Sequence, residues 1–218
     1  MTQSSSKALI VWGGWSGHQP KECADVVAQL LKDEDFAVQV EEGAQAFDTQ
    51  DLTRYNLIVP VITMGKFEGD GASKLLNAVQ NGVGIAGFHG GLGDSFRDHT
   101  RYQYMIGGQF VEHPGGKIEY TVNITRPEDP IVAGISDFQY KSEQYYMHVD
   151  PSNEVLATTT FTGEHDFWVD GTVMPVVWKR HYGKGRVFYS SLGHDAAEFD
   201  MPQMREIFRR GMLWAAGR

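Results

Sequence analysis

Short apolar runs alternate with amphipathic stretches over the first ninety residues, and this order constrains the fold more than any other feature of the chain. The pattern predicts four strands, at residues 8–12, 36–40, 57–62 and 83–88. Apolar residues at helical spacing predict helices over about 20–32 and around 75–79. Strands that alternate with helices indicate an α/β fold with a mostly parallel sheet flanked by helices.

Pro60 lies inside the third apolar run. Because proline cannot donate a ladder hydrogen bond, it either argues against a place in the middle of a sheet for this strand or lies at the end of the strand.

The second half of the chain is richer in strand patterns. We predict a helix over 97–106, strands at 117–125 and 154–161, and a final helix that begins at Pro202. Two β-rich segments, 175–179 and 186–190, flank a glycine-containing loop and predict a β-hairpin near the C-terminus. Residues 1–218 contain no linker or repeat that would divide them, so we predict a single domain.

Three glycine-rich loops follow predicted strands, and each contains a histidine. They are residues 13–18 (GGWSGH), 87–91 (GFHGG) and 191–195 (SLGHD). In open α/β sheets ligands bind at the carboxyl ends of the strands, so these loops predict one site at one sheet edge.

His89 has the sequence context of a nucleophile elbow, Gly-x-nucleophile-x-Gly after a strand. A histidine stands where serine or cysteine would act, and the only cysteine, Cys23, lies in the first predicted helix. We expect His89 on a strand-to-helix turn with its side chain facing a cleft. The alternative is a turn histidine held by hydrogen bonds.

His194 follows the last predicted strand, where a general base belongs, with Asp195 or Glu198 to orient it. The alternative is a histidine that caps its loop. If His89 and His194 face one site, two close imidazoles indicate a divalent metal or an acid/base pair.

Residues 141–148 supply further candidates on an extended segment. Glu143 and Tyr145 share one face, and His148 lies on the other. Each face combines a polar group with an aromatic ring that a sugar could contact, although a partly buried aromatic strand has the same pattern. His113 lies in a glycine-containing loop and is either a site residue or a solvated histidine.

A divalent metal is the cofactor that these residue types suit, because imidazole and carboxylate bind Zn²⁺, Mn²⁺ or Fe²⁺. Our predicted catalytic residues are His89, His194 and Glu143, and the predicted ligands are a subset of His89, His113, Glu143 and His194. Trp15, His18, Tyr145 and His148 are predicted to contact substrate, with His18 and His148 as second-choice ligands. His165 is a candidate for a lid over the site.

Charge and missing motifs exclude several classes of function. The formal net charge is −9, which disfavours nucleic-acid and anionic-membrane partners. A phosphate-binding loop and a dinucleotide fingerprint are both missing from the sequence, so we expect no nucleotide cofactor. We expect a cytoplasmic protein, since the N-terminus has no secretory pattern and one cysteine suits a reducing compartment.

Several blocks, in order along the chain, resemble the ThuA-like (trehalose utilisation) family. They are residues 12–18 (WGGWSGH), 87–91 (GFHGG), 104–110 (YMIGGQF) with His113-Pro114, 143–146 (EQYY), 175–178 (PVVW) and 183–194 (GKGRVFYSSLGH).

The resemblance implies a flavodoxin-like sheet of the class I glutamine amidotransferase type. It also implies carbohydrate catabolism, on 3-keto-sugars or 3-keto-glycosides that partner oxidoreductases make. His89 would occupy the amidotransferase cysteine position and His194 the triad histidine position, so we expect no glutaminase activity.

Three functions remain open at this stage. The first is hydrolysis or elimination at the glycosidic bond of a keto-sugar, with a His/Glu site that holds a metal. The second is a non-catalytic sugar-binding or scaffold protein, and the third is an amidase that uses Cys23. The small-molecule partner is a carbohydrate, and a homo-oligomer is possible.

Overall fold

A computed structural model describes residues 6–218 of the chain. The helices are α1 (Pro20–Asp33), α2 (Ala46–Thr49), α3 (Gly71–Gln80), α4 (His89–Gly93), α5 (Thr100–Ile106) and α6 (Pro202–Ala215). The strands are β1 (Lys7–Gly14), β2 (Ala37–Glu42), β3 (Leu57–Thr63), β4 (Gly84–Phe88), β5 (Gly108–Glu112), β6 (Lys117–Ile124), β7 (Phe138–Glu143), β8 (Tyr146–Val149), β9 (Glu154–Thr160), β10 (Val173–Tyr182) and β11 (Gly185–Ser190). The predicted α/β class is confirmed.

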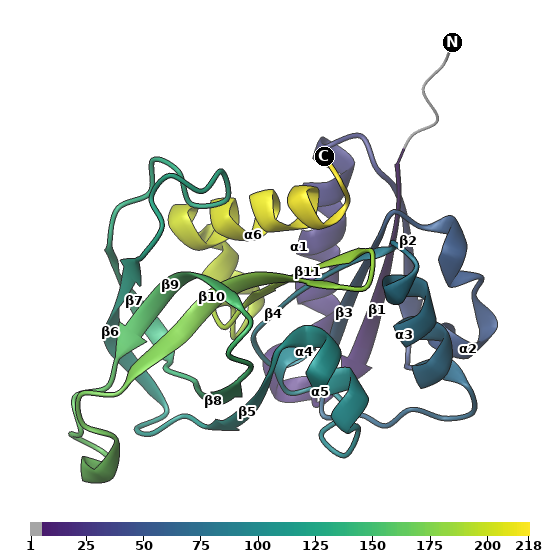
Figure 1. The fold of residues 1–218 in the computed structure, drawn as a ribbon. Helices are drawn as coiled ribbons and strands as arrows, with labels where there is room; N and C mark the ends of the chain where they lie inside the picture. Colours follow the sequence, from purple (N-terminus) through teal and green to yellow (C-terminus); the bar gives the residue numbers. More distant parts are fainter. Residues whose placement is uncertain (1–5) are drawn as a thin grey trace.

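One nine-stranded sheet organises the molecule, in the order β2-β1-β3-β4-β11-β10-β9-β6-β7 (Figure 1). The strands from β2 to β11 pair in parallel, and those from β11 to β7 pair antiparallel. The predicted hairpin is the β10–β11 pair. A separate two-stranded sheet joins β5 to β8.

Helices cover both faces of the parallel half. Ala8 and Ile10 of β1 pack into one apolar cluster with residues of α1 and α6, while Leu9 and Val11 pack into a second cluster with residues of α3 and α5. This alternation is what a strand buried on both faces requires. The far end of the antiparallel half is different, because Tyr120 and Tyr140 of β6 and β7 pack into the α6 cluster while Glu119 and Gln139 on the other face are exposed.

Pro60 is where our expectation for a strand end was wrong. It is buried inside β3, opposite Val11 of β1. The β3–β4 register covers only Leu57 and Ile58, so the β4 ladder has ended before the proline. The missing N–H of Pro60 is tolerated because β3 forms no ladder hydrogen bonds with β4 beyond Ile58.

The helix expected over 97–106 begins later, at Thr100. His99 precedes it, and its Nδ1 accepts the backbone N–H of Tyr102 at 3.2 Å. The helix ends before Gly107, whose φ of 84° is the left-handed conformation that glycine adopts readily.

Candidate metal and substrate site

Three strands of the parallel half deliver histidines to the same edge of the sheet. His18 follows β1, His89 follows β4 directly, and His194 follows β11. Since β1, β3, β4 and β11 run parallel, their carboxyl ends meet at this edge. The three glycine-rich loops therefore converge in space although they are far apart in the sequence.

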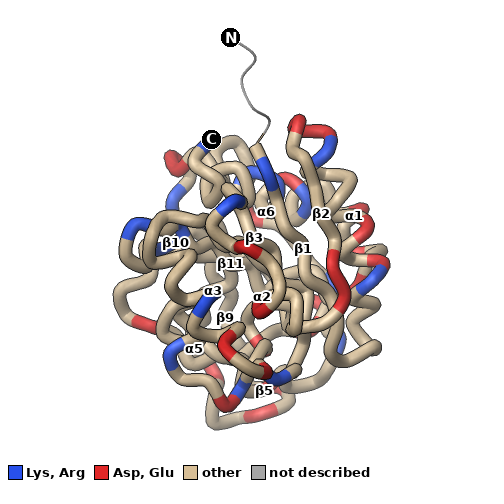
Figure 2. Tube along the Cα trace, turned by 90° about the vertical axis from the view of Figure 1, so that its right-hand side faces the viewer, with Lys and Arg blue, Asp and Glu red and all other residues tan. Residues whose placement is uncertain are grey.

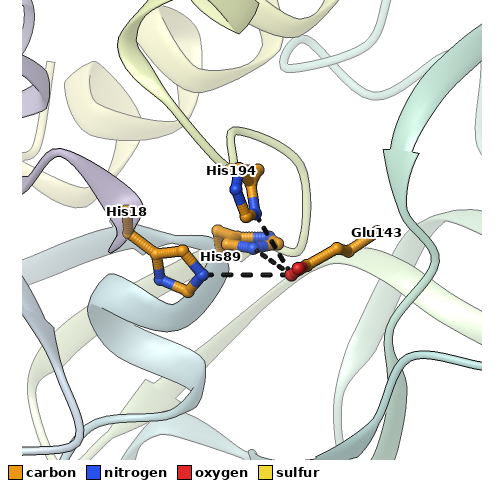
Figure 3. A group of neighbouring side chains, drawn as sticks. All are labelled: His18, His89, Glu143 and His194. Atoms are coloured by element: carbon orange, nitrogen blue, oxygen red, sulfur yellow. Dashed lines mark hydrogen bonds and ion pairs between the residues drawn. The ribbon is translucent and has the colours of Figure 1, made fainter. Parts of the chain in front are cut away.

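Glu143, the last residue of β7, completes the group from the antiparallel half of the sheet (Figure 3). Its Oε2 lies 3.1 Å from Nε2 of His89 and 3.2 Å from Nδ1 of His194. Nε2 of His18 is 3.9 Å from the same oxygen. One carboxylate oxygen thus faces three imidazole nitrogens.

The hydrogen bonds of His89 determine which of its nitrogens carries a proton. Nδ1 lies 2.8 Å from the carbonyl oxygen of Ser191, which can only accept, so Nδ1 is the donor. In the neutral ring Nε2 then presents a lone pair to the Glu143 carboxylate. Two acceptors at this distance require a positive charge between them, either an added proton or a metal ion.

The four ligand atoms are close enough for small side-chain movements to bring them onto a single ion. Ligand atoms at about 2.0–2.2 Å from a tetrahedral Zn²⁺ lie roughly 3.3–3.6 Å apart. The candidate atoms of His18, His89, Glu143 and His194 all lie within 4.8 Å of one another. Nδ1 of His194 is buried and, apart from its 3.2 Å ion-pair contact with Glu143, has no hydrogen-bond partner among the described residues, as expected of an atom that awaits a ligand.

Residues outside the group hold the ligands in place. The ring of His18 shares a 2.8 Å hydrogen bond with the Thr63 hydroxyl, and the Ser191 carbonyl holds His89. Such partners fix the ring orientation of metal-binding histidines. No sequence motif points to Thr63, but its place at the carboxyl end of β3 is a signal that could have identified it.

Burial and mutual charge set the protonation of the group. Burial, followed by the nearby rings of His89 and His194, lowers the pKa of His18 from 6.5 to about 3. Burial alone would raise the pKa of Glu143, but His194 and His89 hold it well below its usual range. At neutral pH His18 is therefore a neutral imidazole and Glu143 a carboxylate, which are the forms that bind metals.

The backbone around His89 is strained, as the elbow pattern implies. His89 has a φ of 46°, and its ring is almost fully buried. A left-handed conformation costs a non-glycine residue about 1–3 kcal/mol and is found often at functional sites. A Cβ on Gly87 would lie 2.4 Å from Leu92, which explains the glycine before the turn.

A cavity of about 120 Å³ opens beside the group, and His18 and Glu143 line it, whereas His89 and His194 do not. Trp15, Phe110 and Tyr145 supply aromatic walls, and the Tyr145 ring stacks on His89 with centroids 4.0 Å apart. Arg97 and Asp94 also line the cavity. They pair through two hydrogen bonds of 2.6 and 2.7 Å, so they offer donors and acceptors without net charge.

Of the other predicted site residues, His113 and Trp15 border the site, whereas His148 and His165 do not. His113 lines the cavity, and its Nε2 is 3.7 Å from Oε1 of Glu143. Trp15 packs edge-on against His18. His148 is exposed on β8 opposite Gln109 and lies outside the four-residue group. His165 does not line this cavity; its ring packs against Gly115.

Neither Asp195 nor Glu198 orients the His194 ring as expected; both contact the backbone of this loop instead. Glu143, and neither of these two, is the carboxylate within ion-pair distance of the His194 ring. Glu198 instead accepts the backbone N–H of His194 at 2.8 Å, and Asp195 caps the short helix at Ala196–Asp200.

Cys23 has no access to the cavity. Its side chain is fully buried in α1, and its Sγ–H donates to the backbone carbonyl of His18 at 3.4 Å. Burial raises the pKa of the thiol from 9.0 to about 12. A thiol in this state is a poor nucleophile, so the geometry argues against an amidase that uses Cys23.

The sequence profile of the trehalose utilisation family, ThuA, matches residues 7–215. The chain belongs to this family. The family is implicated in trehalose utilisation, a part of carbohydrate metabolism. No curated protein matches the chain.

Solved ThuA-like proteins share the fold. One from Parabacteroides merdae aligns with a TM-score of 0.82 at 21% identity, covering 98% of this chain and 90% of that chain. One from Bacteroides uniformis aligns with a TM-score of 0.78 at 19% identity, covering 99% and 94%. A β-galactosidase from Bacillus circulans sp. alkalophilus has a TM-score of 0.62 at 15% identity, covering 97% of this chain but 30% of its own. These likenesses establish the fold.

The charge distribution and the character of the helices concern the expected partners, which include neither nucleic acid nor a membrane. Red acidic segments lie along β2 and beside α1 in Figure 2, with blue basic segments scattered among them. Within residues 6–218, no helix combines the length and apolar character that crossing a membrane requires.

Proposed function

We propose that this ThuA family member is a metal-dependent enzyme that acts on a 3-keto-sugar or 3-keto-glycoside at its glycosidic bond. The observation that carries the proposal is the convergence of three imidazole nitrogens on one carboxylate oxygen, beside a cavity with aromatic walls. His18, His89, Glu143 and His194 would hold a divalent ion such as Zn²⁺, Mn²⁺ or Fe²⁺. When bound, the ion would polarise a keto oxygen and so acidify the neighbouring C–H.

His113 is the group best placed to move a proton. It lines the cavity, and its buried Nδ1 has no hydrogen-bond partner among the described residues. In a 3-keto-glycoside the base removes the proton at C2, the electron pair forms the C1–C2 double bond, and the leaving group departs from C1 with a proton. Addition of water across that double bond completes hydrolysis.

The Arg97–Asp94 pair supports a neutral sugar as substrate. The Asp94 carboxylate already neutralises the guanidinium charge. A phosphorylated or acidic sugar would need an unpaired cation, whereas hydroxyl groups need paired donors and acceptors. The aromatic walls suit the C–H face of a sugar ring.

Turnover of 3-keto-disaccharides, including 3-keto-trehalose, tests the proposal. We expect the metal-loaded enzyme to cleave at least one of them. We expect His113→Ala to lower kcat by about 10²-fold or more, while His181→Ala, an exposed histidine on β10, leaves the rate unchanged. Metal-loaded enzyme that binds these sugars without cleaving any would support the sugar-binding alternative instead.

A further inference from the structure

A cavity much larger than the one at the His/Glu group lies away from that group, on the antiparallel half of the sheet. It has a volume of about 760 Å³, against about 120 Å³ for the cavity that His18 and Glu143 line. Ligand sites commonly measure about 300–1,000 Å³. Residues of β6, β7, β9 and the loop after β9 line it. We call it the sheet groove.

The sheet groove exists because this part of the sheet is covered on one face only. Tyr120, Val122 and Tyr140 point into the core that α6 covers. The alternate residues Glu119 and Gln139 are exposed on the opposite face. The loop that carries His165 forms the wall of the groove.

The lining of the groove suits an uncharged ligand with many hydroxyl groups. Amides, hydroxyls, two carboxylates and one imidazole face it, among them Asn123, Gln139, Thr162, Glu164 and His165. Neither lysine nor arginine belongs to the described lining, so a phosphate or carboxylate ligand would find no counter-charge. Amide and carboxylate groups together can pair with both the donor and the acceptor of a sugar hydroxyl.

Two contacts connect the groove with the catalytic cavity. Gln144 lies between Glu143 and Tyr145, lines the groove, and donates to the Thr159 hydroxyl at 2.8 Å. The His165 ring packs against Gly115, where an added Cβ would lie 2.3 Å from it. Gly115 is two residues from His113, so one loop borders both spaces.

We propose that the sheet groove is a second binding site, for a neutral saccharide, separate from the catalytic cavity. The proposal goes beyond the proposed function, because binding in the groove requires neither the metal nor turnover. The groove binds the saccharide through hydrogen bonds from its sheet face and from the His165 loop, and it shares the 143–145 segment with the catalytic cavity.

Chemical-shift mapping by NMR with trehalose as the probe locates the binding site directly. We expect trehalose to shift the backbone amide signals of residues 119–123, 139 and 160–165 of the isolated full chain. Shifts confined to the neighbourhood of Trp15, His18 and His113 would overturn the proposal and assign the sugar to the catalytic cavity. An absence of shifts at high trehalose concentration would also overturn it. Neither outcome bears on turnover of keto-sugars, so the two proposals fail separately.

A double variant, Glu119→Ala with Gln139→Ala, removes two exposed groups from the sheet face of the groove. We expect it to raise the Kd for trehalose about tenfold, as the loss of two hydrogen bonds implies. The matched control is Glu22→Ala with Gln29→Ala, which removes the same groups from the exposed face of α1 and should leave the Kd unchanged. Equal Kd values for the two double variants would contradict the proposal.

Discussion

At the residue scale, glycines at the site are required by the histidines that pack against them. A Cβ on Gly90 would lie 2.7 Å from the Thr63 hydroxyl and 2.8 Å from the His18 ring. Both are closer than real Cβ contacts, and both atoms belong to the hydrogen bond that orients His18. The glycine-rich loops therefore allow the imidazoles to approach one another.

We predict that Gly90→Ala displaces the His18 ring and weakens metal binding at least tenfold, since a lost orienting contact costs metal sites about 10–100-fold in affinity. The overpacking should also lower the free energy of unfolding by about 1–3 kcal/mol. Gly134→Ala is the control, because a Cβ there meets nothing within 4 Å and only backbone strain is added. Titration calorimetry would count against this account if Gly90→Ala bound the metal as tightly as wild type.

We predict that the Cys23 thiol is unreactive in the folded chain. Its burial and raised pKa leave little thiolate at pH 8. A thiol-reactive disulfide reagent should therefore modify Cys23 slowly under native conditions. After denaturation the same reagent should titrate one thiol per chain. Fast native modification that also abolished turnover would reopen the amidase hypothesis.

At the element scale, the loop after β11 is held by the antiparallel half of the sheet. The Glu198 carboxylate accepts hydrogen bonds from the Tyr140 hydroxyl at 2.5 Å and the Ser142 hydroxyl at 2.8 Å. It also accepts the backbone N–H of His194. Glu198 thus links β7 to the histidine loop, and β7 itself ends at Glu143.

We predict that Glu198→Ala lowers the free energy of unfolding by about 3 kcal/mol, because it leaves buried donors without a partner. It should also weaken metal binding, since His194 loses the contact that positions its backbone. Glu154→Ala, which removes an exposed ion pair with Arg126 and a longer contact with Lys179 (which keeps its partner Asp129), should cost less than about 1 kcal/mol and leave the metal affinity unchanged. Denaturant unfolding and metal titration of the two variants check the prediction. If Glu198→Ala bound the metal as tightly as wild type, Glu198 would not position His194 for metal binding.

A second element-scale prediction concerns pH and the ion pairs of α6. Hydrogen bonds from Arg209, then from Arg210, lower the pKa of Glu206 from 4.5 to about 2 although burial opposes this. Because the folded-state pKa is depressed, the stabilisation is present above about pH 4.5 and is lost as the pH falls towards 2. Glu206→Gln should therefore be less stable than wild type at pH 7, and the difference should shrink between pH 4.5 and 2. A difference that stays constant over this window would show that the pair contributes nothing through charge.

At the scale of the whole molecule, local pattern was enough to predict most elements of both halves, but not how the antiparallel half packs against the parallel one. The alternation of strands and helices led to the right class and to one sheet edge for His89 and His194, because parallel strands place their carboxyl ends together. The inclusion of Glu143 depended on how the antiparallel half packs against that edge. Spacing along the chain contains no such information, which is why Glu143 stayed one candidate among several and His18 only a second choice.

The exposed position of His148 shows the same limit. Residue parity placed it on the face opposite Glu143. The extended segment is not one strand, however: β7 ends at Glu143, β8 begins at Tyr146, and β8 pairs with β5 in a separate sheet. Long-range pairing of this kind is fixed by tertiary packing, which overrides local strand patterns.

Titration of Zn²⁺ into the metal-stripped chain tests the central claim most directly. We predict one ion per chain, a Kd raised at least tenfold in His89→Ala and in His194→Ala, and an unchanged Kd in His181→Ala. Circular dichroism of each variant controls for folding. Zn²⁺ binding that is absent in the folded wild-type chain, or equally tight in His89→Ala and His194→Ala, would contradict the claim that these loops form a metal site.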